Sequence, residues 1–453
     1  AAPRQEARYM ARGATHVLGL DIGTAFIKAA EIQLRGDEFH VVGRPAVIPT
    51  PEGAVRGGVV VDAPAVAEVL KEIRARYGAK TKKVIASVGG DSSVVVRITE
   101  VPRMSGKELD EAIQWELDEQ TPFPVDEVIY DYAPIEPEDA DPEATEMEVL
   151  MAVAQEDLVA AHVETIQSGG MHPVAIDVEP LAIGRAIVGA AGDEYADQTV
   201  VSVHIGATNT LILIFRHKLL SFVRVIPSAG ENFTQSMAQA LMLDQDQAEV
   251  VKLLLGNILE GGFVEEPEEA DEFGGMGMFE DEGRAEDEFA SDSVFELSSA
   301  EEEAELGPVD DRATHLEIDE DLEEIEEPVT EEAPEPVEQE PQDPDLVEAR
   351  EHVGEALTEP VLDVATEVRR SLDFYRRQHR NEPIDRIVVT GGSANIEGLA
   401  QLITEETGVT AEPGNPFEHL HIDDESIPEA YLRDIGPSSV IAVGLALRDM
   451  VVD

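Results

Sequence analysis

The sequence of 453 residues contains no cysteine, which excludes disulfide bonds, metal sites built on thiolates and a redox role for the chain. Long apolar runs are also missing. The longest, such as Thr210 to Phe215, have the length of a strand and fall well short of the roughly 18 to 20 residues that a membrane span needs. Residues 1–15 include arginines but no apolar run, so we expect no secretory signal there. Attachment to a membrane is therefore expected to come through a partner.

Basic residues are scarce. Lys and Arg number 32 against 96 Asp and Glu, and the formal net charge is −64. Nucleic acid and anionic lipid are bound through basic patches, so this balance argues against both partners. The acidic residues concentrate in the segment 260–350, where Glu, Asp and Pro dominate and apolar residues show no regular spacing. Such a segment cannot bury enough apolar surface to offset its ordering entropy. We predict a disordered acidic insertion, either a solvated spacer or a recognition segment anchored by its few Phe, Met and Val residues.

Outside this insertion, strand and helix patterns alternate, which predicts an α/β protein. Two segments repeat each other. Val17 to Leu34 predicts a buried strand, a tight turn and a second strand, and Val200 to Arg216 predicts the same three elements when Gly23 is set on Gly206. This duplicated hairpin predicts two similar half-domains that face each other. Residues 83–178 lie between the halves, and their strands and two amphipathic helices predict a small α+β subdomain.

The two predicted turns carry Gly and hydroxyl residues. Backbone N–H groups in such a turn can cradle phosphate oxygens, and Gly lets a phosphate approach the backbone closely. Two turns facing each other would clamp a polyphosphate, whereas a single one is better explained as an ordinary hairpin turn. A carboxylate at Asp21 would add affinity for Mg²⁺ through water, because Mg²⁺ sheds its hydration shell reluctantly. The residues of the two hairpins predicted to hold the ligand are Asp21, Gly23, Thr24, Lys28, His204, Gly206, Ala207, Thr208 and Asn209.

Two phosphate hairpins followed by a Gly-rich turn before a late helix resemble the superfamily of actin, sugar kinases and FtsA. Within it, the sequence resembles the PilM family of type IV pilus assembly proteins most closely. The resemblance rests on LGLDIGTAFIKAAEIQ, ELDEQTPFPVDEVIYDY, VAIDVEPLAIGRAI, VVSVHIGATNTLILIF, RSLDFYRRQ, DRIVVTGGSANIEGLAQLI and GNPF. It covers the chain except for the N-terminal tail and the acidic insertion. The segment TPFPVDEV discriminates best, because it lies in a subdomain that FtsA and PilM share and actin lacks, although it is also explained as a rigid loop that closes a helix.

The resemblance implies an actin-like, two-lobed fold of the FtsA/PilM type, with duplicated ribonuclease-H-like subdomains, an extra small α+β subdomain, and ATP with Mg²⁺ between the lobes. For one implied pair of site residues, a solvated ion pair on a helix is an equally good interpretation. That pair is Glu249 and Lys252, and the other implied residues are Gly230 and Glu231 after the second hairpin and Gly391, Gly392 and Ser393 beside the adenosine.

The resemblance also divides the chain into domains. These are a disordered tail at 1–15, a first lobe at 16–82, the extra subdomain at 83–178, a return to the first lobe at 179–198, a second lobe at 199–259, the insertion at 260–350, the rest of the second lobe at 351–434, and a C-terminal helix at 435–453 that returns to the first lobe.

The implied partner is the N-terminal peptide of the inner-membrane protein PilN, bound in a groove beside the extra subdomain, which would place a cytoplasmic protein at the inner membrane. Contacts with the pilus motor ATPases or the platform protein are also attributed to the family, and self-association into a ring stays open. His204 departs from the superfamily pattern, because active actin-like ATPases usually carry Asp there. A neutral imidazole cannot replace a carboxylate near Mg²⁺ and water. We therefore expect a nucleotide-binding adaptor with weak or no ATPase activity.

Three other functions fit parts of the pattern. A division-ring tether like FtsA would carry a C-terminal amphipathic helix, which we do not expect in the segment ALRDMVVD. An actin-fold small-molecule kinase would need a catalytic base and a substrate pocket, and no segment offers either clearly. A type II secretion adaptor would carry a membrane span after its actin-like part, and we expect none here.

Overall fold

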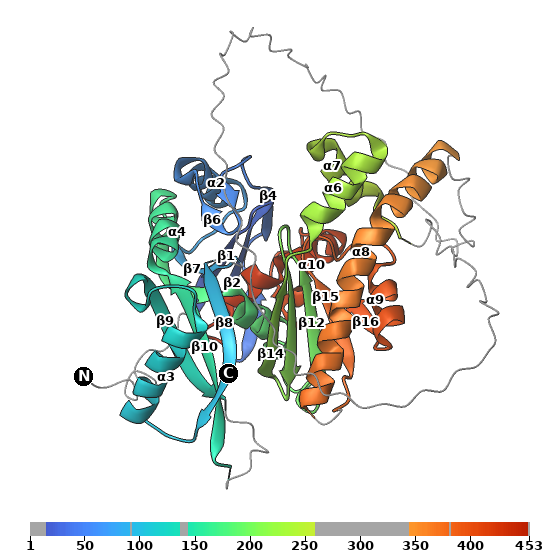
Figure 1. The fold of residues 1–453 in the computed structure, drawn as a ribbon. Helices are drawn as coiled ribbons and strands as arrows, with labels where there is room; N and C mark the ends of the chain where they lie inside the picture. Colours follow the sequence, from blue (N-terminus) through green and yellow to red (C-terminus); the bar gives the residue numbers. More distant parts are fainter. Residues whose placement is uncertain (1–14, 91–92, 136–143, 259–343, 380–381, 452–453) are drawn as a thin grey trace, which may run out of the picture. The chain divides into compact units, whose positions relative to one another are not determined.

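The computed structural model describes residues 15–90, 93–135, 144–258, 344–379 and 382–451 (Figure 1). The chain divides into two compact units, residues 1–263 with 342–453 and residues 264–341, and every described residue lies in the first unit. The predicted tail up to residue 14 and the predicted insertion up to residue 343 lie outside the described residues. The end of that insertion was expected to be disordered up to residue 350. Instead, the structure begins helix α8 (Pro344–Gln378) there, with proline at its first position, where this residue costs no hydrogen bond.

The first lobe is built on a mixed seven-stranded sheet. Strand β1 lies inside it, parallel to β7 and antiparallel to β2. On one face, Leu18 and Leu20 pack with helix α2 (Ala63–Arg76), and on the other face Val17 packs with helix α10 (Glu429–Ala446). Because both faces are covered, β1 is a nearly continuous apolar run. The order of the sheet is β11 (His172–Val178), β7 (Lys83–Val88), β1 (His16–Ile22), β2 (Phe26–Arg35), β3 (Glu38–Val41) and β17 (His421–Ile422), with β4 (Ala46–Pro49) beside β2.

The second sheet repeats the arrangement of the first. Its order is β14 (Leu219–Ile226), β13 (Thr210–Arg216), β12 (Thr199–Ile205), β15 (Arg386–Thr390) and β16 (Ala411–Pro413). Strand β12 is antiparallel to β13 and parallel to β15, as β1 is to β2 and β7. The two hairpin turns also close with the same bond. Gly23 N donates to Phe26 O at 3.2 Å, and Gly206 N donates to Asn209 O at 3.0 Å. The duplicated hairpin predicted from the sequence is therefore confirmed, down to its turn.

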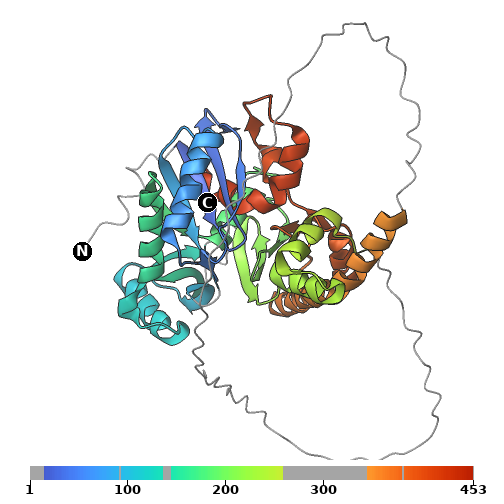
Figure 2. The ribbon, with the colours of Figure 1, turned by 90° about the horizontal axis from the view of Figure 1, so that it is seen from above.

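Four helices cover the second sheet and its end: α6 (Gly230–Leu241), α7 (Gln245–Leu255), α8 and α9 (Leu399–Thr407) (Figure 2). Helix α8 presents a stripe of apolar residues at spacings of three and four, which is the period of one helical face. The buried members of this stripe include Val353, Leu357, Val361, Val364, Val368, Leu372 and Tyr375.

A small three-stranded sheet has the order β8 (Val94–Pro102), β10 (Glu146–Gln155) and β9 (Val128–Ile135). Helix α3 (Lys107–Gln120) covers one face of it with Leu109, Ile113 and Leu117. The boundaries predicted for this subdomain, 83 and 178, fall on β7 and β11, and the structure pairs both strands within the first sheet. Helix α4 (Glu156–Ser168) follows β10 directly and leads back to the first lobe (Figure 1).

Two helical segments connect the sheets. Helix α5 (Glu179–Gly184) and the π-helix η2 (Arg185–Gly189) lead from β11 towards β12, and α10, which follows β17 of the first sheet, contacts both β1 and β15. Their contact requires glycine, because a Cβ on Gly444 of α10 would lie 1.7 Å from the carbonyl oxygen of Ala182 in α5. No helix in the described ranges is long and apolar enough to span a membrane. Short elements complete the lobes, namely the hairpin β5 (Val55–Arg56) and β6 (Val59–Val60) and the 3₁₀ turns η1 (Val125–Glu127) and η4 (Pro416–His419).

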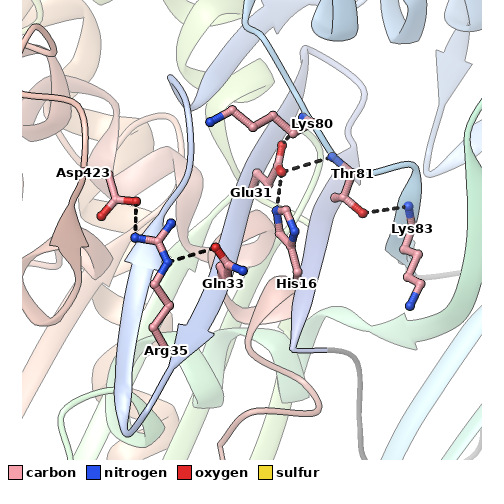
Figure 3. A network of polar contacts seen from close by, with 8 residues as sticks. All are labelled: His16, Glu31, Gln33, Arg35, Lys80, Thr81, Lys83 and Asp423. Carbon is pink, nitrogen blue, oxygen red and sulfur yellow. Dashed lines mark hydrogen bonds and ion pairs between the residues drawn. The ribbon is translucent and has the colours of Figure 1, made fainter.

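A buried carboxylate fastens the segment before β7 to the first sheet (Figure 3). Glu31 on β2 is 3% exposed and accepts hydrogen bonds from the backbone N–H groups of Lys80 (2.7 Å) and Thr81 (3.1 Å), and from His16 Nε2. At the end of the same strand, Arg35 Nη1 lies 2.7 Å from Asp423 Oδ2 in the segment that follows β17. These contacts hold the first and last parts of the chain on one sheet.

Candidate functional site

A cleft lies between the turn of the first hairpin and the turn of the second. It brings together nearly all residues that the sequence singled out, from five separate parts of the chain. The predicted residues on its wall are Asp21, Gly23, Thr24, Lys28, His204, Gly206, Ala207, Thr208, Asn209, Gly230, Glu231, Glu249, Lys252, Gly392 and Ser393. Gly391 is the predicted residue that does not line it.

The first hairpin contributes an ion pair. Asp21 and Lys28 face each other across β1 and β2, and Lys28 Nζ donates to Asp21 Oδ2 at 3.0 Å. The Asp21 side chain is almost fully buried, so its charge is balanced within the protein rather than by water. Lys28 is also close enough to the second hairpin to act on the pKa of His204. The hairpins therefore share one electrostatic environment.

The second hairpin holds a neutral imidazole where the first holds a carboxylate. His204 is 5% exposed, and its Nδ1 lies 3.0 Å from Thr390 Oγ1 on the neighbouring strand β15. Burial, helped by the positive charge of Lys28, lowers the pKa of His204 to about 3. The ring is thus uncharged throughout the physiological pH range, and Asp21 supplies the one carboxylate of the hairpin pair.

Helix α6 begins directly against the second turn. Gly230 N donates to Gly206 O at 3.1 Å, and Glu231 N donates to Ala207 O at 2.8 Å. A Cβ on Gly230 would lie 3.0 Å from both Gly206 O and Ser393 Oγ, which is tighter than ordinary packing allows. Glycine at this position lets the helix, the second turn and the Gly-rich turn approach one another.

The ammonium group of Lys252 on α7 makes three hydrogen bonds to other groups of the protein. Its Nζ donates to Gly230 O (3.1 Å), Thr234 Oγ1 (2.9 Å) and Glu249 Oε2 (2.7 Å), and its side chain is 5% exposed. This burial rules out the solvated helix pair that the sequence left open. Because an ammonium group has three donors, Lys252 positions Glu249 and the start of α6 rather than offering a free donor to a ligand.

The two glycines of the Gly-rich turn, Gly391 and Gly392, have different roles. Gly391 has a φ of +97°, and a Cβ there would lie 2.1 Å from Ile205 O, so only glycine fits. Its N–H donates to Pro437 O of α10 at 2.7 Å. A Cβ on Gly392, by contrast, would meet no atom within 4 Å. Gly391 shapes the turn, and Gly392 leaves space on the wall of the cleft.

The sequence analysis missed one side of the cleft. Ser87 lies near the end of β7, Gly89 and Gly90 follow that strand, Glu179 follows β11, and His162 comes from α4. Strands β1, β7 and β11 are parallel, so the residues after their carboxyl ends meet at one edge of the sheet, where ligands of α/β proteins bind. Once this strand order is known, the rule indicates Glu179. Nothing in the sequence alone would have indicated His162, because its spacing from Leu158 and Ile166 is that of a buried helical face.

Glu179 is a titratable group at the floor of the cleft. Its removal from bulk water, together with the negative charge of Asp21, raises the pKa of Glu179 to about 7, although Lys28 opposes the shift. Its carboxyl group lies against the backbone of Gly89, where a Cβ would come within 2.0 Å of Glu179 Oε1. Among the described residues, no three His, Asp or Glu side chains form a group that could hold a metal ion without other ligands.

Comparison with known proteins identifies the family. The family model for type IV pilus assembly protein PilM matches residues 19–257 and 348–450. The chain belongs to the PilM family. The segment between the matched ranges, which the family model does not match, includes most of the predicted insertion.

The same comparisons place the PilM-family fold among actin-like proteins. A chain of a solved PilM–PilN type IV pilus biogenesis complex has a TM-score of 0.68 and 26% identity, covering 96% of this chain and 98% of that one. FtsA of Bacillus subtilis (strain 168) is 24% identical over 53% of this chain and 58% of its own length, and FtsA of Streptococcus pneumoniae serotype 2 (strain D39 / NCTC 7466) is 21% identical over 52% and 55%. The chain therefore spans little more than half the length of these curated relatives. The predicted actin-like, FtsA/PilM-type fold is confirmed.

Proposed function

We propose that this PilM-family protein is an ATP-binding adaptor of type IV pilus assembly that binds the N-terminal peptide of PilN. The main support for nucleotide binding is the cleft between two hairpin turns that are closed by the same backbone hydrogen bond. Gly23 and Gly206 occupy equivalent places in these turns, and both line the cleft. Turns of this kind offer backbone N–H groups to phosphate oxygens. Two of them facing one cleft fit a chain of phosphates better than a single anion.

The rest of the cleft fits a nucleoside. Glu249 uses Oε2 to bind Lys252 and Thr234, and its Oε1 has no hydrogen-bond partner among the described residues. A ribose hydroxyl could donate to this oxygen. The open space at Gly392 lies on the same wall and is suited to the flat face of adenine.

Mg²⁺ is the expected companion of the phosphates. Asp21 fits it as an acceptor for water bound to the ion, since Mg²⁺ keeps several waters and takes few protein ligands. The ion would neutralise phosphate charge. Because His204 is neutral, the hairpin pair gives the metal a single carboxylate, and burial raises the pKa of Glu179 to about 7. We therefore expect slow or absent hydrolysis, with ATP acting as a structural ligand or a slow switch.

The PilN part of the proposal is supported by family membership and by the likeness to the PilM–PilN complex. The chain has a net charge of −64, so a peptide with basic residues would be attracted to it over a long range. Binding PilN would hold the protein at the inner membrane. Contacts with the motor ATPases or the platform protein, and assembly into a ring, stay predictions from the family resemblance.

The test uses the full chain and a synthetic PilN N-terminal peptide. Calorimetry measures peptide binding with and without MgATP, at low and at high salt, and a scrambled peptide of equal charge serves as the control. We expect binding that weakens with salt and that the scrambled peptide does not reproduce. Absence of binding under every condition would show that the adaptor proposal is wrong. Equal binding with and without MgATP would leave the adaptor intact and exclude a nucleotide switch.

A further inference from the structure

His162 is a polar side chain in a position that would suit an apolar one. It lies on the buried face of α4 between Leu158 and Ile166, and it is 1% exposed. It is nevertheless part of the cleft wall, together with Asp21, Ser87 and Glu179. Burying an imidazole without using both nitrogens costs stability, so a buried histidine that faces a ligand cleft calls for a partner there.

Its hydrogen bonding fixes which nitrogen is free. Nδ1 lies 2.9 Å from the carbonyl oxygen of Leu158, and a carbonyl can only accept, so Nδ1 carries the proton. Burial lowers the pKa of His162, although Asp21 and the Leu158 carbonyl oppose the shift, and the ring is therefore neutral. Nε2 is then a lone-pair acceptor, and it has no hydrogen-bond partner among the described residues. An atom that donates a hydrogen bond must approach it from the cleft.

Helix α4 connects this nitrogen to the small sheet. The helix starts at the residue that follows β10, without an intervening loop. Ala154 at the end of β10 and Leu158 in the first turns of α4 share a buried cluster with Val88, the last residue of β7. The next residues of the chain after Val88 are the cleft-lining glycines. A displacement of the small sheet would therefore be passed along α4 to His162 and the phosphate end of the cleft.

We propose that Nε2 of His162 accepts a hydrogen bond from a water molecule held beside Asp21 when nucleotide fills the cleft, and that this bond lets the small sheet sense the nucleotide. His162 is thus a positioning residue that acts through water. This inference rests on the proposed nucleotide binding. If nucleotide favours one position of α4, then by linkage a partner that favours the same position must raise nucleotide affinity by the same factor.

Two substitutions separate the roles of the two nitrogens. The amide of Asn reaches about the place of Nδ1, so H162N keeps the donor to Leu158 O and removes the acceptor in the cleft. The longer Gln side chain carries its amide oxygen towards the place of Nε2, so H162Q restores that acceptor. Loss of one neutral hydrogen bond should weaken MgATP binding about 2- to 12-fold in H162N, and H162Q should recover part of this loss.

Calorimetry gives the affinities, and hydrogen exchange of residues 94–102, 128–135 and 146–155 reports on the small sheet with and without MgATP. In the wild type, we expect MgATP to increase protection in this sheet, and H162N should lose that increase while its exchange without nucleotide stays unchanged. Wild-type protein that binds MgATP without any change in these strands would overturn the inference even if a variant failed to fold. So would H162N with wild-type affinity and protection. Wild-type protein that does not bind MgATP would instead overturn the proposed function, and this inference with it.

Discussion

Neighbouring glycines in the Gly-rich turn are expected to respond to substitution in opposite ways. Gly392 has an ordinary backbone conformation and open space around its missing Cβ. Replacement by Ala there should raise the free energy of unfolding by about 0.4–1 kcal/mol, because it restricts the unfolded chain without strain. Gly391 has a φ of +97° and no room for a Cβ beside Ile205 O. Its replacement by Ala should lower the free energy of unfolding by about 2–5 kcal/mol, from the left-handed backbone and the overlap together.

Substitution of Gly392 by a residue with a larger side chain tests nucleotide binding. Leu at this position should fill the space on the cleft wall without unfolding the protein. At a concentration of 100 times Kd, MgATP should stabilise the wild type by about 2.7 kcal/mol, and this gain should vanish in Gly392→Leu. Thermal unfolding with and without MgATP measures both quantities for wild type, Gly391→Ala, Gly392→Ala and Gly392→Leu. The reasoning is refuted if Gly392→Leu keeps the full ATP-dependent shift, or if Gly391→Ala is as stable as wild type.

Three further outcomes are expected. Glu31→Ala should cost about 1–3 kcal/mol in chemical denaturation because it leaves backbone donors of Lys80 and Thr81 without their acceptor, whereas Gln33→Ala on the same strand should change stability by less than about 0.5 kcal/mol. The pKa of Glu179 is raised to about 7 in the folded protein, so the free energy of unfolding of the wild type should fall by about 3 kcal/mol at most as the pH rises from 4.5 to 7. Glu179→Gln should remove this dependence on pH. Equal slopes in the wild type and the variant would contradict the raised pKa. Deletion of residues 264–341 with a short Gly/Ser bridge should leave the thermal midpoint and MgATP affinity nearly unchanged, and a large drop would show that the segment packs on the described unit.

The sequence predicted the parts of this fold that depend on local pattern. The hairpin around Gly23 and its repeat around Gly206 were predictable because an apolar strand, a Gly turn and a second strand form a short-range unit. Helix α3 was predictable from the spacing of Leu109, Ile113 and Leu117. The position of β7 was not, because a strand's own residues do not say which sheet it joins. Its pairing with β1 is decided by packing between segments far apart in the chain.

The site residues also divide into those that a local sequence pattern predicts and those that it does not. Residues next to a recognisable turn, such as Asp21 and Gly392, were predicted from their neighbours in sequence. Glu179 and His162 reach the cleft only through the order of strands in the first sheet and the course of α4, which no local pattern contains. The burial of Lys252 was also not predictable from the sequence, because it depends on contacts with Gly230 and Thr234 from a different helix.

The first sheet is completed by the last part of the chain, and this affects how the protein can be made. Strand β3 pairs with β17 in the register His40 to His421, and the apolar face around Val17 and Ile32 is covered by Ile441 of α10. At roughly 5–20 residues per second, about 20–80 s of synthesis separate β3 from α10. For that time, the nascent first lobe presents an uncovered apolar face at the ribosome. Ribosome-associated chaperones should therefore engage the chain until α10 emerges from the ribosome.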